Sequence, residues 1–481
     1  MTDEELASRI FSLDDQIAFA RLSSDWNPMH LDRAFARRTQ VGAVVVHGIH
    51  NLAWAADAVL KIHPLRVANI RARFLQPLYL DERTSVRIRD RADQHIEFEI
   101  VAANTVVAHV KLSSKPGRFA GEHVQTGEAA PARLSEPANL RFEQLAGEAG
   151  VVAIGDGAAG AAFPALTESI GLAAVEALLA TSYIVGMACP GLHSLFAGLD
   201  VNCAAAGGAE GALAYAVTKV DPRFRSLQID ISGAGLAGRL DVFARPAPPS
   251  QPAMTEVSTR VTGNPFAGQT SLIVGGSRGL GEVTAKIVAA GGGYPVITYV
   301  ESKDEAEQIA ADIRSAGGQC EILRYDALSP AAGQLQKLGL IDCCYYFATP
   351  KIFQRKSGLY EPEKLRAFLR VYADGFSDLC VALAENRNRK LAMFYPSTVA
   401  IDEPTSSTAE YAMAKMAGEI LAKHLNEFTS GIHVICSRLP RILTDQTASV
   451  GVASAERALD VMLPIVYEVQ QAARPDQALR G

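Results

Sequence analysis

The segment SLIVGGSRGLG, residues 271–281, decides the fold of the C-terminal part of the chain. A short apolar run leads into a cluster of glycines, and a helical pattern follows to about residue 290. Glycine permits a tight turn and lets a diphosphate group approach the backbone, and the start of a helix offers free N–H groups. The segment therefore predicts a strand, a glycine-rich turn and a helix that together can bind a dinucleotide.

More apolar runs follow this segment and alternate with helical patterns. They lie at 294–300, 320–326, 341–348, 390–397 and 432–439. Strands that alternate with helices are typical of a doubly wound parallel sheet. We therefore expect residues 266–481 to form an α/β domain of the Rossmann type.

The first half of the chain has a different pattern. A helix buried on almost all sides is expected near residues 49–60, and strands with alternating apolar residues follow at 95–100 and 105–112. This order predicts a sheet wrapped around one central helix. The segment TQVGAVVVHGIHNL (39–52) aligns with SYIVGMACPGLHSL (182–195), and strand patterns follow again, so we expect an α+β fold that occurs twice.

Two stretches without apolar periodicity divide the chain. Pro and polar residues gather at 247–265, and Gly, Pro and charged residues gather at 114–137. We therefore expect a multidomain protein, with two α+β domains at 1–125 and 138–246, a linker at 247–265, and the α/β domain at 266–481.

The composition narrows the classes of function. The 481 residues carry a formal charge of −6, and no run approaches the roughly 18 apolar residues that a membrane span needs. These features argue against nucleic acid or a membrane as a partner. The seven cysteines include no CxxC pair, so we expect no disulfide framework and no zinc site, and a cytoplasmic location fits. His47 and His50 lack acidic or cysteine companions in sequence, so we expect no metal.

The strongest chemical signal in the α/β part is a Tyr and a Lys four residues apart. Tyr411 and Lys415 share one face of an expected helix, and Ser397 ends an expected strand before it. A free Tyr, with a pKa of about 10, is a poor acid at neutral pH, but a nearby ammonium favours its phenolate. The three residues can move a proton while a nicotinamide moves a hydride. A Tyr–Lys pair on its own is also typical of an ordinary helix surface.

Residues 268–445 resemble the short-chain dehydrogenase/reductase family, and within it the ketoacyl-thioester reductases. The glycine-rich turn matches the family motif, with Val274 in place of a Thr. The resemblance implies a catalytic trio of Ser397, Tyr411 and Lys415. It also implies that the cofactor is bound by Tyr411 and Lys415 together with Gly275, Ser277, Arg278, Gly279, Leu280, Gly281, Asp326 and Ala348.

Two motifs of that family are altered in this chain. Phe347-Ala348-Thr349 stands where the family has N-A-G, and residues 370–375 lack the Asn that usually completes the catalytic set. The alternative that one half of the protein is inactive, and serves as a docking or oligomerisation module, therefore stays open.

Residues near the second strand of the α/β part bear on the choice of cofactor. An acid at the end of that strand binds the ribose 2′-hydroxyl in NAD enzymes, and Glu301 stands at this place. Arg278 can instead meet a 2′-phosphate. We expect NADP(H), with NAD as the alternative.

A second group of polar residues crowds one turn near the N-terminus. The stretch DWNPMHLD (25–32) brings Asp25, Asn27 and His30 together, and Gly48 opens the buried helix. An Asp and a His that face one cleft can activate water and exchange a proton with carbon. The N–H of Gly48 can stabilise charge on a thioester oxygen. Asp and Asn are also typical of turns and helix caps.

Residues 10–112 resemble the MaoC-like dehydratases, which are (R)-specific enoyl-thioester hydratases with a hot-dog fold. Besides the stretch 25–32, the family motifs are matched by Phe11-Ser12, Asp15, Phe19-Ala20, Ser23 and His47-Gly48. The resemblance implies that Asp25 and His30 are the catalytic pair, that Asn27 supports them, and that the two α+β domains form a double hot dog.

The second α+β domain lacks the D-x-N-P-x-H pattern. We expect residues 138–246 to be a non-catalytic half that, as in related two-domain hydratases, makes room for the acyl chain. A catalytic pair of Cys189 and His193 is the alternative, although no third group that would orient it is evident.

The two resemblances imply one substrate chemistry. We expect a homo-oligomeric enzyme, such as a dimer, that reduces a 3-ketoacyl thioester with NADPH and dehydrates the (R)-3-hydroxyacyl product to the trans-2-enoyl thioester, or runs the second step in reverse. Coenzyme A or an acyl carrier protein is expected to carry the thioester. The alternative is the opposite flux, with hydration before NAD-linked oxidation as in β-oxidation.

Overall fold

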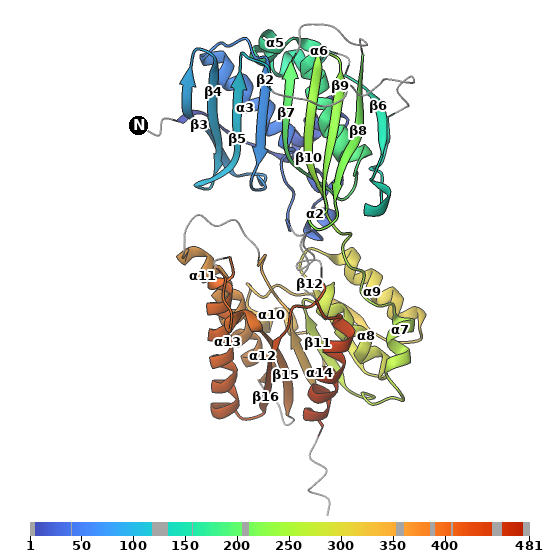
Figure 1. Cartoon of the computed structure of the whole chain (residues 1–481). Coiled ribbons are helices and arrows are strands. Elements are labelled where there is room, and N and C mark those ends of the chain that lie inside the picture. The colour runs from blue at the N-terminus through green and yellow to red at the C-terminus, as the bar shows by residue number, and fades with distance from the viewer. Residues whose placement is uncertain are drawn as a thin grey trace, which may run out of the picture. The chain divides into compact units, whose positions relative to one another are not determined.

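The computed structural model of the chain divides into two compact units, Met1–Ala247 and Pro248–Ala448 with Val452–Gly481 (Figure 1). The residues that the structure describes are 5–39, 41–117, 133–155, 157–203, 211–352, 360–384, 390–405, 407–444 and 455–474. The division falls close to the start of the expected linker at 247–265. Each unit is described by itself below.

The first unit is built on one antiparallel sheet of ten strands (Figure 1). Its strand order is β1-β3-β4-β5-β2-β7-β10-β9-β8-β6. The first five strands are β1 (Glu5–Ile10), β2 (Asn69–Phe74), β3 (Arg83–Ala92), β4 (His95–Ala102) and β5 (Thr105–Ser113). The other five are β6 (Ala149–Ala153), β7 (Ser194–Cys203), β8 (Ala212–Asp221), β9 (Ser226–Gly233) and β10 (Leu236–Ala244). β2 and β7 pair antiparallel at the centre and join the two halves.

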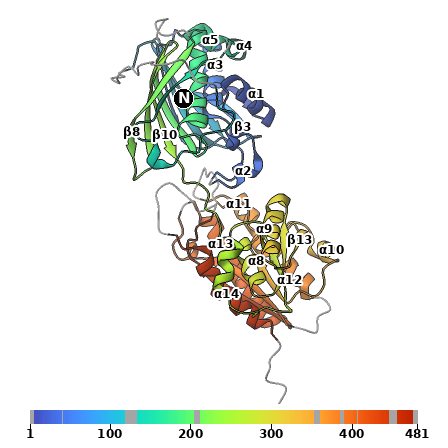
Figure 2. The same cartoon turned by 90° about the vertical axis from the view of Figure 1, so that its right-hand side faces the viewer.

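The helices of the first unit lie on one side of this sheet (Figure 2). In the first half they are α1 (Leu13–Ser23), the 3-10 turn η1 (Pro28–His30), α2 (Arg33–Arg37) and α3 (Gly48–Ile62). In the second half they are α4 (Ala159–Ala162), α5 (Pro164–Ile170), α6 (Leu172–Tyr183) and the π-helical turn η3 (Ile184–Ala188). A single hydrophobic core runs through both halves and includes the buried faces of α3 and α6. The expected repeat of a sheet around a helix is confirmed.

The sequence alignment that suggested the repeat is wrong in register. Gly48 begins α3, whereas Gly191, with which it aligns, lies after the end of η3. The aligned segments therefore stand at opposite ends of their helices. Both halves still follow the same order, because in each of them a first strand, a central helix and four further strands succeed one another. The shared Gly, His and Leu were a chance match.

No single described helix is long and apolar enough to cross a membrane, although the bent pair of α5 with α6 and η3 passes a test of length and composition. Residues 174–183 of α6 are all buried in the core of the first unit, which accounts for their apolar character.

The second unit contains a parallel sheet of six strands in the order β13-β12-β11-β14-β15-β16. The strands are β11 (Thr270–Val274), β12 (Tyr294–Tyr299), β13 (Glu321–Arg324), β14 (Cys343–Tyr346), β15 (Leu391–Thr398) and β16 (Ile432–Leu439). Helices that include α8 (Gly279–Ala290), α9 (Lys303–Ser315), α10 (Ala331–Leu335), α11 (Pro362–Leu369), α12 (Phe376–Ala384), α13 (Ala409–Phe428) and α14 (Ala458–Ala472) connect or follow the strands. The expected doubly wound α/β domain is confirmed.

The expected linker at 247–265 is in large part wrong. Residues Met254–Arg260 form the helix α7, which packs on α8. Met254 and Val257 are buried in the core of the second unit, as is Val261 one turn further on. The prolines around residue 250 made this helical spacing of apolar residues hard to see in the sequence. The second unit begins at residue 248.

Candidate active sites

The predicted hydratase residues lie in a buried loop between α1 and α2. Asp25 and Asn27 directly precede η1, and each is 2% exposed. The side chain of Asn27 caps η1 by accepting a hydrogen bond from the backbone N–H of Met29 at 3.1 Å. The turn chemistry that the sequence suggested is therefore present, and it orders the residues that carry the proposed chemistry.

Asp25 contacts the second half of the first unit as well as its own loop. Its Oδ2 accepts a hydrogen bond from the hydroxyl of Ser182 on α6 at 2.7 Å, and its Oδ1 accepts one from the backbone N–H of Asn27 at 3.1 Å. A Cβ placed on Gly186 would lie 2.3 Å from Oδ1 of Asp25. Burial raises the pKa of Asp25, while the charge of His30 and the bond from Ser182 act in the opposite direction.

Asn27 holds the two halves together at this point. Its Nδ2 donates hydrogen bonds to the carbonyl oxygens of Gly186 at 2.8 Å and Gly191 at 3.2 Å. Both residues belong to the second half, which was expected to be non-catalytic. That half carries no second Asp–His pair at this site, but it positions Asp25 and Asn27 through Ser182, Gly186 and Gly191.

His30 has a defined tautomer. Its Nδ1 lies 2.8 Å from the carbonyl oxygen of Val45, which can only accept, so Nδ1 carries a proton and Nε2 is the basic nitrogen. Burial lowers the pKa of His30, and the nearby carboxylate of Asp25 raises it. The pKa of Asp25 is raised and the pKa of His30 is lowered, so the two pKa values move toward each other. Similar pKa values suit a pair of groups that exchange one proton.

His47 and Gly48 complete this site at the start of α3. The ring of His47 stacks on that of His30 with centroids 3.9 Å apart, and its Nδ1 lies 2.9 Å from Oε1 of Gln16. Gly48 is the first residue of α3, where backbone N–H groups have no partner within the helix. A Cβ at Gly48 would lie 3.2 Å from the ring of Phe74, so glycine suits this close approach.

The expectation that His47 lacks an acidic companion is wrong. Asp25, His30 and His47 each offer one atom that could bind a metal ion, a carboxylate oxygen or a ring nitrogen. These three atoms all lie within 4.8 Å of one another. The chain brings Asp25 to His47 from the loop before η1, so spacing along the sequence could not show it. His50 lies outside this cluster.

The alternative pair of Cys189 and His193 finds no support. Cys189 lies in extended conformation after the end of η3, so Cys189 and His193 do not share a helix face. Burial raises the pKa of Cys189 to about 12, which keeps the thiol protonated at neutral pH.

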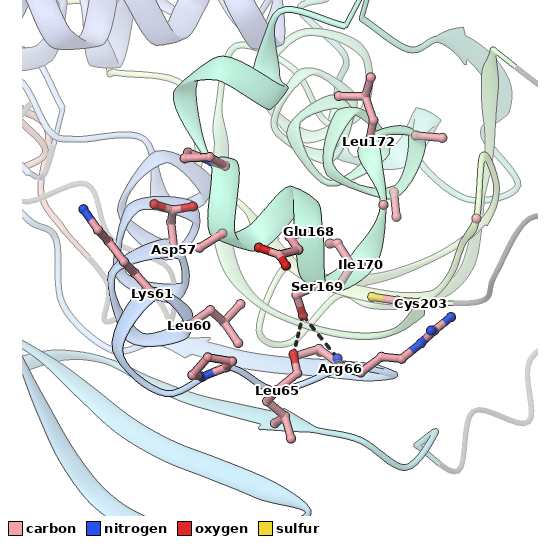
Figure 3. Close-up of a pocket in the computed structure, with 18 of the residues that line it drawn as sticks. Asp57, Leu60, Lys61, Leu65, Arg66, Glu168, Ser169, Ile170, Leu172 and Cys203 are labelled. Carbon is pink, nitrogen blue, oxygen red and sulfur yellow. Dashed lines mark hydrogen bonds between the residues drawn. The ribbon is translucent and has the colours of Figure 1, made fainter.

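A pocket of about 1350 Å³ lies at the other end of α3 and α6 (Figure 3). Its lining includes Asp57, Lys61, Arg66, Glu168 and Leu172, while Asp25 and His30 are not among its lining residues. The Asp25 site lies between the start of α3 and the end of α6, whereas the pocket lies between the end of α3 and the start of α6. The pocket therefore lies at the place in the second half that corresponds to the Asp25 site of the first half.

In the second unit, the glycine-rich turn lies where the strand order reverses. β11 has β12 on one side and β14 on the other, which is the usual ligand-binding point of such sheets. Gly275 has a φ of +75°, and its N–H donates to Oγ1 of Thr298 at 3.0 Å. A Cβ on Gly281 would lie 2.3 Å from the carbonyl oxygen of Gly275, so glycine lets α8 pack closely on the turn. These features fit a cradle for a diphosphate.

The other predicted cofactor residues surround this turn. Ser277 is buried, Arg278 precedes the first residue of α8, and Gly279 and Leu280 form its first turn. The backbone of Ala348 at the end of β14 would lie 3.1 Å from a Cβ on Gly275. Glu301 is exposed just beyond β12.

Asp326 has a structural role that the resemblance did not suggest. Its carboxylate accepts hydrogen bonds from the backbone N–H of Leu328 at 2.9 Å and from the hydroxyl of Ser329 at 3.2 Å. It therefore orders the turn after β13, and its contact with an adenine stays a prediction.

The predicted trio of the second unit is only partly brought together. Tyr411 and Lys415 lie on α13, one turn apart. The hydroxyl of Ser397 donates instead to Oε1 of Glu419 at 2.6 Å. Burial raises the pKa of Tyr411, and a side-chain hydrogen bond with Thr398 acts in the opposite direction. Adjacent side chains of a strand point to opposite faces, and it is Thr398, the last residue of β15, that contacts Tyr411. The catalytic role of Ser397 stays a prediction, and Thr398 is a second candidate for it.

Lys415 is buried among aromatic rings. Its Nζ donates to the carbonyl oxygen of Pro396 at 2.7 Å and lies 4.0 Å from the ring centroid of Tyr372 and 5.0 Å from that of Tyr395. Burial lowers the pKa of Lys415 to about 7. The π-helical turn η4 (Arg370–Gly375), which lacks the family's Asn, thus contributes Tyr372, whose hydroxyl lies 2.5 Å from Oγ1 of Thr349.

Comparison with known proteins gives one family match. Residues 4–111 match the model of the MaoC like domain. The matched segment runs from the N-terminus into β5 and includes Asp25, Asn27, His30 and Gly48. A further relative, an uncharacterized oxidoreductase of Methylorubrum extorquens, is 24% identical over 202 residues, which are 39% of this chain and 79% of that protein.

Among solved structures, a short-chain dehydrogenase/reductase of Serratia marcescens is 20% identical, with a TM-score of 0.39, over 44% of this chain and 94% of its own. A 3-oxoacyl (acyl-carrier-protein) reductase of Agrobacterium tumefaciens with NADP bound is 17% identical, with a TM-score of 0.38, over 42% and 88%. Residues 4–111 of this chain therefore match the MaoC like domain, and the second unit is a doubly wound α/β domain.

Proposed function

We propose that the protein is a bifunctional enzyme of acyl-thioester metabolism. The second unit reduces a 3-ketoacyl thioester with NADPH, and the first unit interconverts the (R)-3-hydroxyacyl thioester and the trans-2-enoyl thioester. The observation that carries the proposal is that one chain holds a buried Asp25–His30 pair next to Gly48 and a Tyr411–Lys415 pair in a domain with a glycine-rich turn. Both chemistries share the 3-hydroxyacyl thioester.

In the first unit, Asp25 and His30 share one proton across the reacting carbons. In hydration, one member of the pair takes a proton from a water molecule whose oxygen bonds to C3, and the other delivers a proton to C2. The N–H of Gly48 stabilises the negative charge that develops on the thioester oxygen. Dehydration is the exact reverse, so the balance of protons is kept in both directions.

In the second unit, Tyr411 donates its hydroxyl proton to the carbonyl oxygen of the ketoacyl group. Thr398 contacts that hydroxyl. An ammonium on Lys415, one turn along α13, favours the phenolate that the donation leaves behind. A nicotinamide supplies the hydride when bound. The close packing at Gly275 and Gly281 is compatible with its diphosphate, and Arg278, which directly precedes α8, is our candidate for binding a 2′-phosphate.

The exposed position of Glu301 and the location of Arg278 at the start of α8 favour NADP(H) over NAD. The rival direction, hydration before NAD-linked oxidation, uses the same residues. It is favoured if NADH or NAD⁺ proves to be the better cofactor.

The experiment offers the purified full chain crotonyl-CoA alone, and acetoacetyl-CoA with NADPH or with NADH. We expect hydration in the first case and faster reduction with NADPH in the second. Absence of one activity over several chain lengths would leave that unit as a docking or oligomerisation module, and absence of both would overturn the proposal.

A further inference from the structure

A buried arginine for which the described residues provide no ion-pair partner lies near the Asp25 site. Arg245 directly follows β10 and is 8% exposed. Its Nε lies 3.4 Å from the carbonyl oxygen of Ser194, and its Nη2 is buried with no hydrogen-bond acceptor among the described residues. No carboxylate of the described part of the chain pairs with it. A buried charge is costly unless it is paired, so this guanidinium is suited to an anion that comes from outside the chain.

His193 offers a second unpartnered nitrogen at the same place. Its Nδ1 is buried without a hydrogen-bond partner in the described part of the chain, and its carbonyl oxygen accepts from the backbone N–H of Arg245 at 2.8 Å. Burial and the charge of Arg245 lower the pKa of His193, so the ring is neutral and can donate one hydrogen bond. A guanidinium and a neutral imidazole side by side form a donor set for one carboxylate.

Two observations connect this donor set to the hydratase residues. Gly191, two residues before His193, accepts a hydrogen bond from Nδ2 of Asn27 at 3.2 Å. The charge of Arg245 is also close enough to His30 to lower its pKa. The donor set therefore borders the catalytic loop from the side of the second half.

We propose that Arg245 and His193 bind a carboxylate at the far end of the substrate's acyl group, so that the hydratase prefers thioesters of dicarboxylic acids. The inference rests on the proposed hydratase function of the same site. A planar carboxylate matches the fork of a guanidinium. The phosphates of coenzyme A could pair with Arg245 as well, but they are strongly hydrated, and a residue that is 8% exposed suits the acyl end better.

The test compares pairs of substrates that differ by one carboxylate. Crotonyl-CoA is compared with trans-glutaconyl-CoA, which is crotonyl-CoA with a carboxyl group on its last carbon, and hex-2-enoyl-CoA is compared with its terminal carboxylate. We expect the wild-type chain to hydrate one of the carboxylated thioesters with a kcat/KM roughly 10- to 100-fold above that of its partner. This measurement needs no variant. A preference for the uncharged member in both pairs, or equal values, would overturn the proposal.

Variants of the full chain then assign the preference to Arg245. In Arg245→Met we expect the ratio of the two kcat/KM values to fall by roughly 10- to 100-fold, and in Arg245→Lys to fall less. Arg223→Met is the matched control, because Arg223 is an exposed arginine of the same half that pairs with Asp221. An unchanged ratio in Arg245→Met would overturn the assignment.

A third arm separates the acyl carboxylate from the phosphates of the carrier. The same pairs are measured as pantetheine thioesters, which lack those phosphates, and the preference should persist. An equal loss for both CoA thioesters in Arg245→Met, with no effect on pantetheine thioesters, would mean that Arg245 binds a phosphate. Hydration of crotonyl-CoA without any preference for a carboxylate leaves the proposed function standing, whereas hydration of none of these thioesters contradicts both.

Discussion

The hydroxyl of Ser182 lies 2.7 Å from Oδ2 of Asp25, so the half without a catalytic motif supplies a hydrogen bond to the carboxylate of the half that has one. The second half also contacts the same loop through Asn27, whose Nδ2 donates hydrogen bonds to the carbonyl oxygens of Gly186 and Gly191. One half of the repeat therefore carries the Asp25–His30 pair, and the other half helps to position Asp25.

Ser182→Ala is expected to lower hydration by roughly 10- to 100-fold, since a hydrogen bond to a charged group contributes about 1.5–3 kcal/mol. The bond from Ser182 lowers the pKa of Asp25, so its loss raises that pKa and moves the acid limb of the kcat/KM profile to higher pH. Ser182→Thr keeps the hydroxyl and should keep the profile. An unaltered profile in Ser182→Ala would contradict a role for this contact.

Gly186→Ala is expected to abolish hydration. The new Cβ would lie 2.3 Å from Oδ1 of Asp25, so either the carboxylate or the π-helical turn must move. Reduction of acetoacetyl-CoA by the same purified chain is the internal control, because the change lies in the other unit. Hydration at the wild-type rate would mean that this close approach is absent in solution.

Thr398→Val is expected to reduce ketoacyl reduction by about 10²-fold, and Ser397→Ala is expected to have a much smaller effect. The reason is that Thr398 contacts the hydroxyl of Tyr411, while Ser397 binds Glu419. Steady-state rates of NADPH oxidation compare the two variants directly. The reverse order of effects would restore Ser397 to the trio.

Tyr372→Leu is expected to shift the pH dependence of reduction. The ring of Tyr372 lies 4.0 Å from Nζ of Lys415 and stabilises the ammonium form, so its removal lowers the pKa of Lys415 below about 7. As the pH rises, Lys415 of the variant loses its proton at a lower pH than in the wild type. Activity should therefore begin to fall at a lower pH than in the wild type. Other groups near Lys415, namely the ring of Tyr395 and the thiol of Cys436, are unchanged.

Tyr372→Phe is the control for that variant, because it keeps the ring and removes the hydroxyl that contacts Thr349. It should retain the wild-type profile. A shift of equal size in both variants would assign the effect to the hydroxyl.

Arg278→Ala is expected to raise the KM for NADPH by roughly 10- to 100-fold and to leave that for NADH nearly unchanged. A guanidinium gains a charge-assisted contact with a 2′-phosphate that NADH lacks. The two Michaelis constants are measured with one ketoacyl thioester. If both rise equally, Arg278 shapes the turn and does not distinguish the cofactors.

The overall architecture could be predicted because periodicity along the chain reports burial. The six strands of the second unit and the buried helix after His47 follow from apolar runs and helical spacing. The turn chemistry of Asp25, Asn27 and His30 is equally local, so its motif was visible in sequence.

The remaining features depend on contacts between distant segments. Ser182 and Gly186 meet Asp25 across more than 150 residues, and no local pattern marks them. Thr398 was missed because a strand turns neighbouring side chains to opposite faces. Tyr372 lies in η4 and contacts Lys415 of α13, so only the folded chain brings the two side chains together, although an aromatic residue in that turn is visible in sequence.

The most direct test of the bifunctional account incubates the full chain with acetoacetyl-CoA and NADPH and identifies the thioester products by mass spectrometry. We expect both 3-hydroxybutyryl-CoA and crotonyl-CoA from the wild-type chain. Asp25→Asn should yield only the hydroxyacyl thioester, and Tyr411→Phe should yield neither product. Crotonyl-CoA that still forms in Asp25→Asn, or a wild-type chain that leaves acetoacetyl-CoA unchanged, would contradict the account.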